Sequence, residues 1–276
     1  MNEPIKKNQI GEIIYKNYIS ENTLTKNEIK DKIENANFEL LSNIQVVSLC
    51  ILPNDQILAT DKDSIHIFDE KFKEIKNIKV PEWTSVGCSL SPKNEIYISD
   101  YTNSCINVFD LSLQKINKFG SKGNGNYQFD GIYRIIWRNG YLYVCDRWNR
   151  RIQTYDINLN FFDSIKLDYI PWSIEVLNKT IGVCGNEGTY FYNLDDKSLI
   201  NEYDKLFGGM NLINSKFYVT VYQPTPHKVK CYDRNGKLCD EFHVNSRINQ
   251  FIEDPYYYQI FAFKKNLVFF SYRCLK

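Results

Sequence analysis

The chain has 276 residues, of which 43% are hydrophobic and 15% aromatic, and its 34 basic and 33 acidic residues leave a net charge of +1. This balance excludes a basic field over the whole surface, which dedicated nucleic-acid-binding domains carry. No apolar run reaches transmembrane length, and the first residues lack the apolar core of a secretory signal. We therefore expect a soluble cytoplasmic protein that does not associate with membranes.

The N-terminal part of the chain predicts two small elements. Residues 12–19 are rich in Ile and Tyr and favour a β-strand. Thr25 and Glu28 have the spacing of a capping box, which predicts a short helix through about residue 35. We expect residues 1–40 to hold a clasp strand and this helix, and residues 41–276 to form the main body of one single domain.

From about residue 46 onward, the same pattern of short apolar runs recurs about every 40 residues. In each clear copy one run ends at an Asp, and a second run ends in an aromatic–Asp pair shortly afterwards. The three clear copies are Asp61 with Phe68-Asp69, Asp100 with Phe109-Asp110, and Asp146 with Tyr155-Asp156. A period of this length that holds several β-rich runs is typical of a propeller blade rather than of a helical repeat.

Four strands fit into each copy. Runs such as residues 142–145 are apolar without interruption, which indicates a strand buried on both faces between neighbouring blades. The Asp of each aromatic–Asp pair then opens a tight turn into an outer strand. The expected starts of the inner strands are Val46, Val86, Ile132, Ile174, Leu212 and Phe251. We therefore predict an all-β, six-bladed propeller of four-stranded blades, whose short last blade is completed by the N-terminal strand.

Two segments of this pattern resemble the NHL-repeat β-propellers. Residues 119–132 look like the glycine-rich start of an NHL repeat, and residues 142–156 look like its core of strand, Asp, two residues, Asn, one residue, Arg-Ile-Gln, aromatic and Asp. The copy that ends at Asp110 is similar but has Cys105 where the family has Arg, and a later copy has Gly185 in place of the loop Asp. The resemblance implies the fold and a role in interactions, often as the substrate-reading end of ubiquitin ligases.

Arginine and aromatic side chains are concentrated in one repeat unit. They are Arg134, Arg138, Arg147, Arg150 and Arg151, interleaved with Tyr133, Trp137 and Trp148. One interpretation is structural, with Arg151 bracing its own loop against Asp146. The other makes Arg147, Trp148 and Arg150 a ligand-binding loop, because guanidinium groups suit carboxylate or phosphate and indole rings suit stacking.

Aromatic residues also occur where the chain leads into the inner strands, which in a propeller surround one mouth of the central channel. They are Trp83, Phe129, Tyr133 and Trp172, and the proline-containing loop of residues 222–228 adds Tyr222 and His227. If these side chains share one concave surface, they form a binding site for a peptide or small molecule. The alternative is that they pack between blades.

The sequence offers little support for a metal site or a catalytic site. The three histidines lie in different units, and the eight cysteines lack paired spacing, so we expect reduced, buried thiols and no metal or cofactor. Glu175, on its inner strand, is the one acidic residue to consider, and a single carboxylate does not make a site. We therefore predict no catalytic residues.

The predicted function is that of a non-enzymatic scaffold that binds a protein or peptide partner through one face of the ring. RNA binding through the arginine and aromatic face is the first alternative. A metal-dependent lyase or lactone hydrolase, which some propellers resembling this one are, is the second. The sequence leaves the oligomeric state open.

Overall fold

The computed structural model describes residues 46–80, 84–204, 208–213, 215–221 and 228–243, the strands at residues 17–18, 256–263 and 266–273, and the single positions 27 and 82. The predicted helix over residues 25–35 and the predicted blade start at Phe251 lie outside these residues, apart from position 27. In the described part of the chain, no helix is long and apolar enough to cross a membrane.

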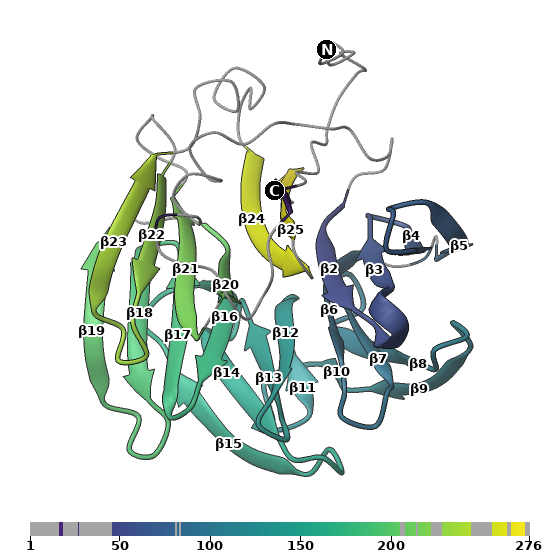
Figure 1. Cartoon of the computed structure of the whole chain (residues 1–276). Coiled ribbons are helices and arrows are strands. Elements are labelled where there is room, and N and C mark those ends of the chain that lie inside the picture. Colours follow the sequence, from purple (N-terminus) through teal and green to yellow (C-terminus); the bar gives the residue numbers. More distant parts are fainter. Residues whose placement is uncertain are drawn as a thin grey trace.

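Five four-stranded antiparallel sheets follow one another along the chain, and each is ordered as its strands occur in the sequence (Figure 1). The first three sheets are β2 (Ser48–Ile51), β3 (Ile57–Thr60), β4 (Ser64–Phe68) and β5 (Glu74–Lys79); β6 (Ser85–Leu90), β7 (Ile96–Asp100), β8 (Cys105–Phe109) and β9 (Lys115–Phe119); and β12 (Ile132–Arg138), β13 (Tyr141–Asp146), β14 (Arg151–Tyr155) and β15 (Phe161–Lys166). The other two are β16 (Pro171–Leu177), β17 (Thr180–Gly185), β18 (Gly188–Asn193) and β19 (Leu199–Asp204); and β20 (Met210–Ile213), β21 (Lys216–Val221), β22 (Lys228–Tyr232) and β23 (Leu238–His243).

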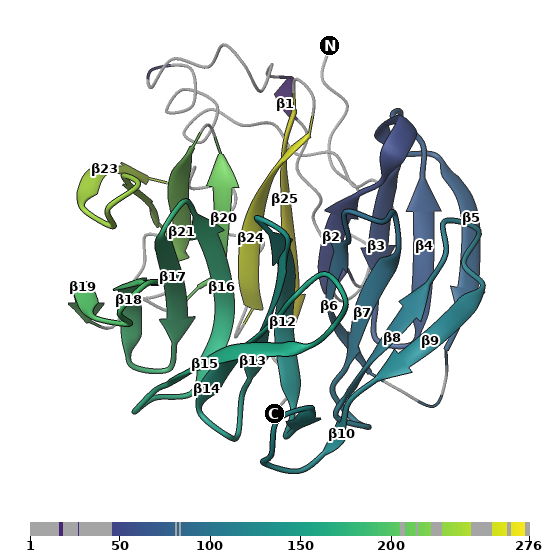
Figure 2. The ribbon, with the colours of Figure 1, turned by 90° about the horizontal axis from the view of Figure 1, so that it is seen from below.

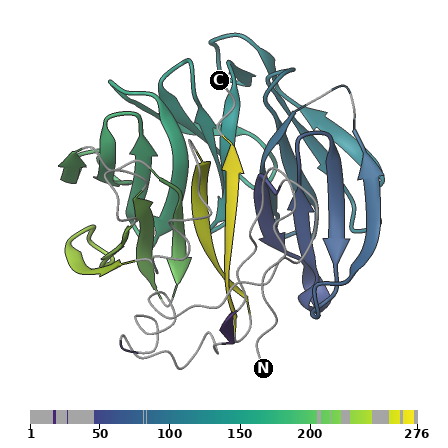
Figure 3. The same ribbon diagram turned by 90° about the horizontal axis from the view of Figure 1, so that it is seen from above.

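The sheets are arranged radially, with the strands β2, β6, β12, β16 and β20 innermost and each beside the next (Figures 2 and 3). The predicted propeller of four-stranded blades is therefore confirmed for five blades. Their inner strands begin within a few residues of the predicted positions.

A further sheet has three strands, in the order β1 (Asn17–Tyr18), β25 (Asn266–Arg273) and β24 (Tyr256–Phe263). Strand β24 contacts β20, and Figures 1 to 3 place the yellow strands between the β20 and β2 blades. Strand β1 pairs antiparallel with β25, so that Asn17 lies opposite Leu267. Two residues of the predicted clasp at residues 12–19 thus pair with the last strand of the chain.

One hairpin turn recurs between the third and fourth strands of the blades. The Oδ1 atom of its first residue accepts the backbone N–H groups two and four positions later, at Asp69, Asp110, Asp156 and Asp233. The fourth position of the turn has a positive φ, as at Phe72, Leu113, Leu159 and Gly236. The prediction that these Asp residues open tight turns is therefore confirmed.

The core lies between the blades, because the second and third strands bury both of their faces. Seven of the eight cysteines lie in the described residues, and all seven are free thiols. Six of them are buried, and the exposed one is Cys239. The predicted burial of the cysteines is therefore confirmed for these six and is wrong for Cys239.

The glycine-rich segment before β12 contains two short strands, β10 (Ser121–Lys122) and β11 (Gln128–Phe129), which pair in parallel. The two strands return the segment against the blade formed by β12–β15. The backbone of this segment binds Asp146 and Arg151 of the same blade.

Candidate functional site

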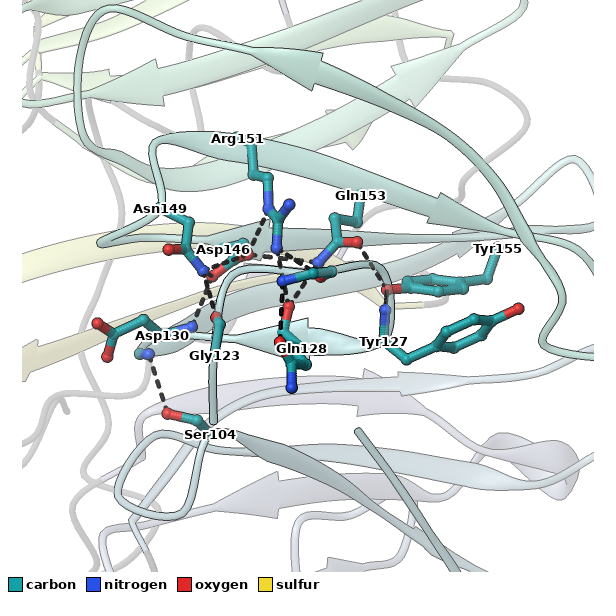
Figure 4. A network of polar contacts seen from close by, with 12 residues as sticks. Ser104, Gly123, Tyr127, Gln128, Asp130, Asp146, Asn149, Arg151, Gln153 and Tyr155 are labelled. Carbon is teal, nitrogen blue, oxygen red and sulfur yellow. Dashed lines mark hydrogen bonds and ion pairs between the residues drawn. The ribbon is translucent and has the colours of Figure 1, made fainter. Parts of the chain in front are cut away.

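A buried aspartate anchors the glycine-rich segment to its blade (Figure 4). Asp146 is fully buried at the end of β13, and its carboxylate accepts hydrogen bonds from Arg151 Nε at 2.7 Å, Asn149 Nδ2 at 2.9 Å and the Asp130 backbone N–H at 2.7 Å. Burial raises the pKa of Asp146 above its usual value, although these donors oppose the shift. The Asp, Asn and Arg of the repeated motif therefore bind one another and the glycine-rich segment, so these contacts give all three a structural role.

The guanidinium of Arg151 extends the anchor into the glycine-rich segment. Its Nη2 donates to the carbonyl oxygens of Gly125 and Gln128, both at 2.9 Å. Gln153 donates from Nε2 to the same Gln128 oxygen at 2.8 Å and accepts from the Tyr155 hydroxyl at 3.0 Å. The structural interpretation of Arg151, as a brace against Asp146, is thus what the structure shows.

The equivalent aspartates of the two preceding blades have different partners. Asp100 is bound by the side chain of Asn103 at 2.8 Å, and no cation is paired with it in the described residues. In the first blade His66 is buried between two carboxylates, with Nε2 at 3.3 Å from Asp61 Oδ2 and Nδ1 at 3.3 Å from Glu74 Oε2. Burial alone would lower the pKa of His66, but the two carboxylates outweigh it and raise this pKa above 6.5.

Directly after the anchor, the Arg147 side chain lies among three aromatic rings. Its guanidinium carbon is 5.0 Å from the ring centre of Tyr133, 4.6 Å from that of Trp148 and 5.9 Å from that of Trp172. Trp148 is 48% exposed and donates from Nε1 to the Tyr101 hydroxyl at 3.0 Å. We call Tyr101, Tyr133, Arg147, Trp148 and Trp172 the Arg147 cluster.

Neighbouring blades bring the members of the Arg147 cluster together. Tyr133 and Trp172 lie near the starts of the inner strands β12 and β16, while Trp148 lies in the β13–β14 turn. Trp148 packs directly against the backbone of Gly131. Only glycine permits this contact, because a Cβ atom there would lie 2.6 Å from Trp148 Cδ1 and the φ of the residue is +67°. A side chain at this position would therefore push the indole away.

Electrostatically, Arg147 is unusual for a buried arginine. The side chain is 8% exposed, and its Nε and Nη1 atoms are buried without a hydrogen-bond partner. Within the described residues no carboxylate lies at ion-pair distance from it. The aromatic faces stabilise the charge by cation–π contact, but a buried cation is ordinarily paired as well.

The structure unites four of the predicted ligand-binding residues. Tyr133, Arg147, Trp148 and Trp172 form the cluster, and Arg150 lies in the same turn, where it donates to the Asp168 carbonyl at 3.2 Å. Phe129 is fully buried in the core among Phe119, Ile132 and Tyr155, so it packs between strands and does not reach a binding surface. The remaining candidates, Trp83, Tyr222 and His227, lie outside the described residues.

Sequence reasoning missed Tyr101. This residue directly follows Asp100, as Arg147 directly follows Asp146, so it occupies the same position in the preceding blade. Its ring lies edge-on to that of Tyr133, with the centroids 6.4 Å apart. Aligning the loop position after each repeated Asp would have found it.

The five arginines of this unit do not form one basic face. Arg138 binds Glu175 through two contacts, Nε to Oε1 at 2.8 Å and Nη2 to Oε2 at 3.1 Å. Arg134 is buried and donates from Nη2 to Asn211 Oδ1 at 2.9 Å. Arg151 binds Asp146, and Arg147 and Arg150 lie in the turn that follows. The five arginines therefore lie in three places: beside the inner strands, at Asp146 and in the β13–β14 turn.

A cavity of about 370 Å³ lies between the inner strands. Its lining includes Arg134, Arg138, Glu175 and Asn211 together with apolar side chains and two cysteines. Glu175, the predicted acidic residue of the inner strands, is fully buried and held by Arg138. Among the described residues, no group of three or more His, Cys, Asp or Glu side chains is arranged to hold a metal ion.

Comparison with known proteins identifies the fold. No family model matches the chain, and neither does any curated protein. The similar solved structures include a protein of unknown function from Bacteroides caccae, with a TM-score of 0.59 and 15% identity over 85% of this chain and 94% of that one. The fold is that of a β-propeller.

WD40 propellers are among the other similar structures. The structure of U3-55K matches with a TM-score of 0.54 and 10% identity, covering 83% of this chain and 96% of that one. The WD40 repeats of RRP9 match with a TM-score of 0.54 and 10% identity over 84% and 96% of the two chains. At such low identity the likeness extends to the propeller architecture alone.

Proposed function

We propose that the protein is a non-enzymatic recognition propeller that binds a protein or peptide segment through the Arg147 cluster. The observation that carries this proposal is a solvent-exposed tryptophan stacked on an arginine that is buried between aromatic rings. Trp, Tyr and Arg are the residues that dominate binding energy at protein interfaces. Propellers, including those of the WD40 type, often serve as scaffolds for protein binding, which supports the proposal.

The finer features of the fold belong to the same proposal. The β1-β25-β24 sheet would be the sixth blade, closed by the N-terminal strand, and the chain would be an NHL-type propeller of the cytoplasm. The contacts of Asp146, Asn149 and Arg151 support the NHL assignment, because they give each matching motif residue a structural role. The pairing of Asn17 with Leu267 supports the closure.

RNA binding is the weaker alternative. Nucleic-acid backbones are held by several cations on one surface, whereas Arg138 and Arg151 are each paired with a carboxylate here. A lyase or hydrolase is also less favoured, because Arg138 already binds the buried carboxylate of Glu175 through two contacts.

A peptide-display selection tests the proposed function. Peptides selected on the wild-type protein should bind Trp148→Ala at least roughly tenfold more weakly, since a central Trp contact is worth about 2 kcal/mol or more. Phe162→Ala is the matched control, because Phe162 is 60% exposed but lies on the outer strand β15. Equal binding to all three proteins, or selection of no peptide at all, would contradict the proposal.

A further inference from the structure

We infer that the partner segment presents a carboxylate to the guanidinium of Arg147. This inference rests on the proposed function and names the chemistry that the Arg147 cluster recognises. It starts from a buried cation for which the described residues offer no hydrogen-bonded acceptor at Nε and Nη1.

The aspartates nearest in sequence are committed to other groups. Asp146, the preceding residue, accepts from Arg151, Asn149 and the Asp130 backbone. Asp100, its equivalent in the preceding blade, accepts from the backbone and side chain of Asn103. Neither carboxylate serves as the counter-ion of Arg147.

The aromatic rings determine which part of Arg147 a ligand can use. Ring faces provide cation–π stabilisation, but they offer the guanidinium N–H groups no oxygen acceptor. They also keep water away, which strengthens any charge–charge contact made at this point. The Nη2 atom makes no hydrogen bond to the described residues and, unlike Nε and Nη1, is not an unpartnered nitrogen shut off from solvent, so a carboxylate can approach there first. Displacement of the exposed Trp148 would then open Nε as well, giving the two parallel contacts that suit a carboxylate.

Two other ligand chemistries fit these observations less well. A phosphate backbone would be expected to contact several cations, but the neighbouring Arg150 and Arg151 already donate within the fold. A cationic side chain could use the aromatic rings, but the guanidinium of Arg147 already occupies the space between them. A carboxylate can first bind Nη2 with the guanidinium in place, and it neutralises the buried charge.

The test is a double-mutant cycle measured by calorimetry. From a peptide that binds in a Trp148-dependent manner, a matched peptide is made with each Asp or Glu changed in turn to Asn or Gln. One such change should weaken binding to the wild-type protein by roughly 10- to 100-fold, as expected for loss of a charged hydrogen bond. The same change should weaken binding to Arg147→Met by less than about threefold, because the partner charge is absent.

Arg147→Lys provides a second variant, which keeps the charge if the methionine variant proves unstable. It should retain part of the effect, since Lys cannot form the two parallel contacts. Melting temperatures of both variants show whether they remain folded.

The outcomes separate the inference from the proposed function. Peptides that need Trp148 but whose acidic residues show no coupling to Arg147 would overturn the inference and leave the proposed function intact. Basic peptides that bind Arg147→Met as well as the wild type would also overturn it, in favour of a cation site. RNA that binds with a steep salt dependence, in the absence of any Trp148-dependent peptide, would overturn both.

Discussion

Substitution of Asp146 by Ala is expected to destabilise the protein more than substitution of any of the side chains that bind it. The carboxylate is fully buried, and its removal deprives the side chains of Arg151, Asn149 and Gln153 of an acceptor. Arg151 is the critical partner, because its side chain is 14% exposed and would keep its charge with two carbonyl oxygens but no carboxylate as partners. Burial raises the pKa of Asp146, so the intact pair contributes little by itself, and the cost comes from the arginine left behind.

The expected magnitude follows from the loss of one partner of a buried ion pair. Such a loss costs about 3–5 kcal/mol in free energy of unfolding. For a chain of 276 residues, an unfolding entropy of about 2.1 cal/mol/K per residue amounts to about 0.6 kcal/mol/K. A cost of about 4 kcal/mol therefore lowers the melting temperature by about 7 °C.

Asp100→Ala is the matched control, since Asp100 holds the same position in the neighbouring blade without a cationic partner. Its loss removes hydrogen bonds alone and should cost about 1–2 kcal/mol. Calorimetric melts of both variants provide the comparison. In the double variant Asp146→Ala/Arg151→Met, roughly half of the lost stability should return, because the unpaired charge is gone. Equal losses for Asp146→Ala and Asp100→Ala, or no recovery in the double variant, would refute the reasoning.

Two further predictions concern the first blade and the Arg147 cluster. The raised pKa of His66 means that its contribution to stability is complete below about pH 6.5 and is lost as the pH rises through the folded-state value. In thermal melts, the advantage of the wild type over His66→Gln should therefore shrink from pH 6 to pH 8, and an advantage that grows with pH would contradict this. Gly131→Ala and Gly140→Ala both place Ala at positive φ, which should cost about 1–2 kcal/mol in each, and Gly131→Ala must also displace Trp148. Gly131→Ala alone should weaken Trp148-dependent peptide binding, because nothing lies within 4 Å of a Cβ at Gly140; equal binding by both variants would exclude the role of Gly131.

The architecture was readable from the sequence because its signals are local. The repeated Asp turns depend on hydrogen bonds between residues two and four positions apart, as at Asp69 and Asp156. Each copy of the repeat therefore contains every residue that its turn needs. The strands between them are apolar on both faces wherever blades pack, and this too appears in short windows. The role of Arg151 was predictable for the same reason, since its partner Asp146 lies five residues away.

The candidate site depended on the tertiary structure. Five arginines lie within one unit of the sequence, but the length of β12 and the alternation of its side chains direct Arg134 and Arg138 into the central cavity. Arg147 and Arg151 are only four residues apart, yet one contacts rings from neighbouring blades and the other contacts its own loop. Tyr101 and Trp172 join this site from positions distant in the chain, because radial packing brings the loops of successive blades together. A pattern within one repeat specifies its own strands and turns, whereas contacts between blades depend on how neighbouring blades pack against each other.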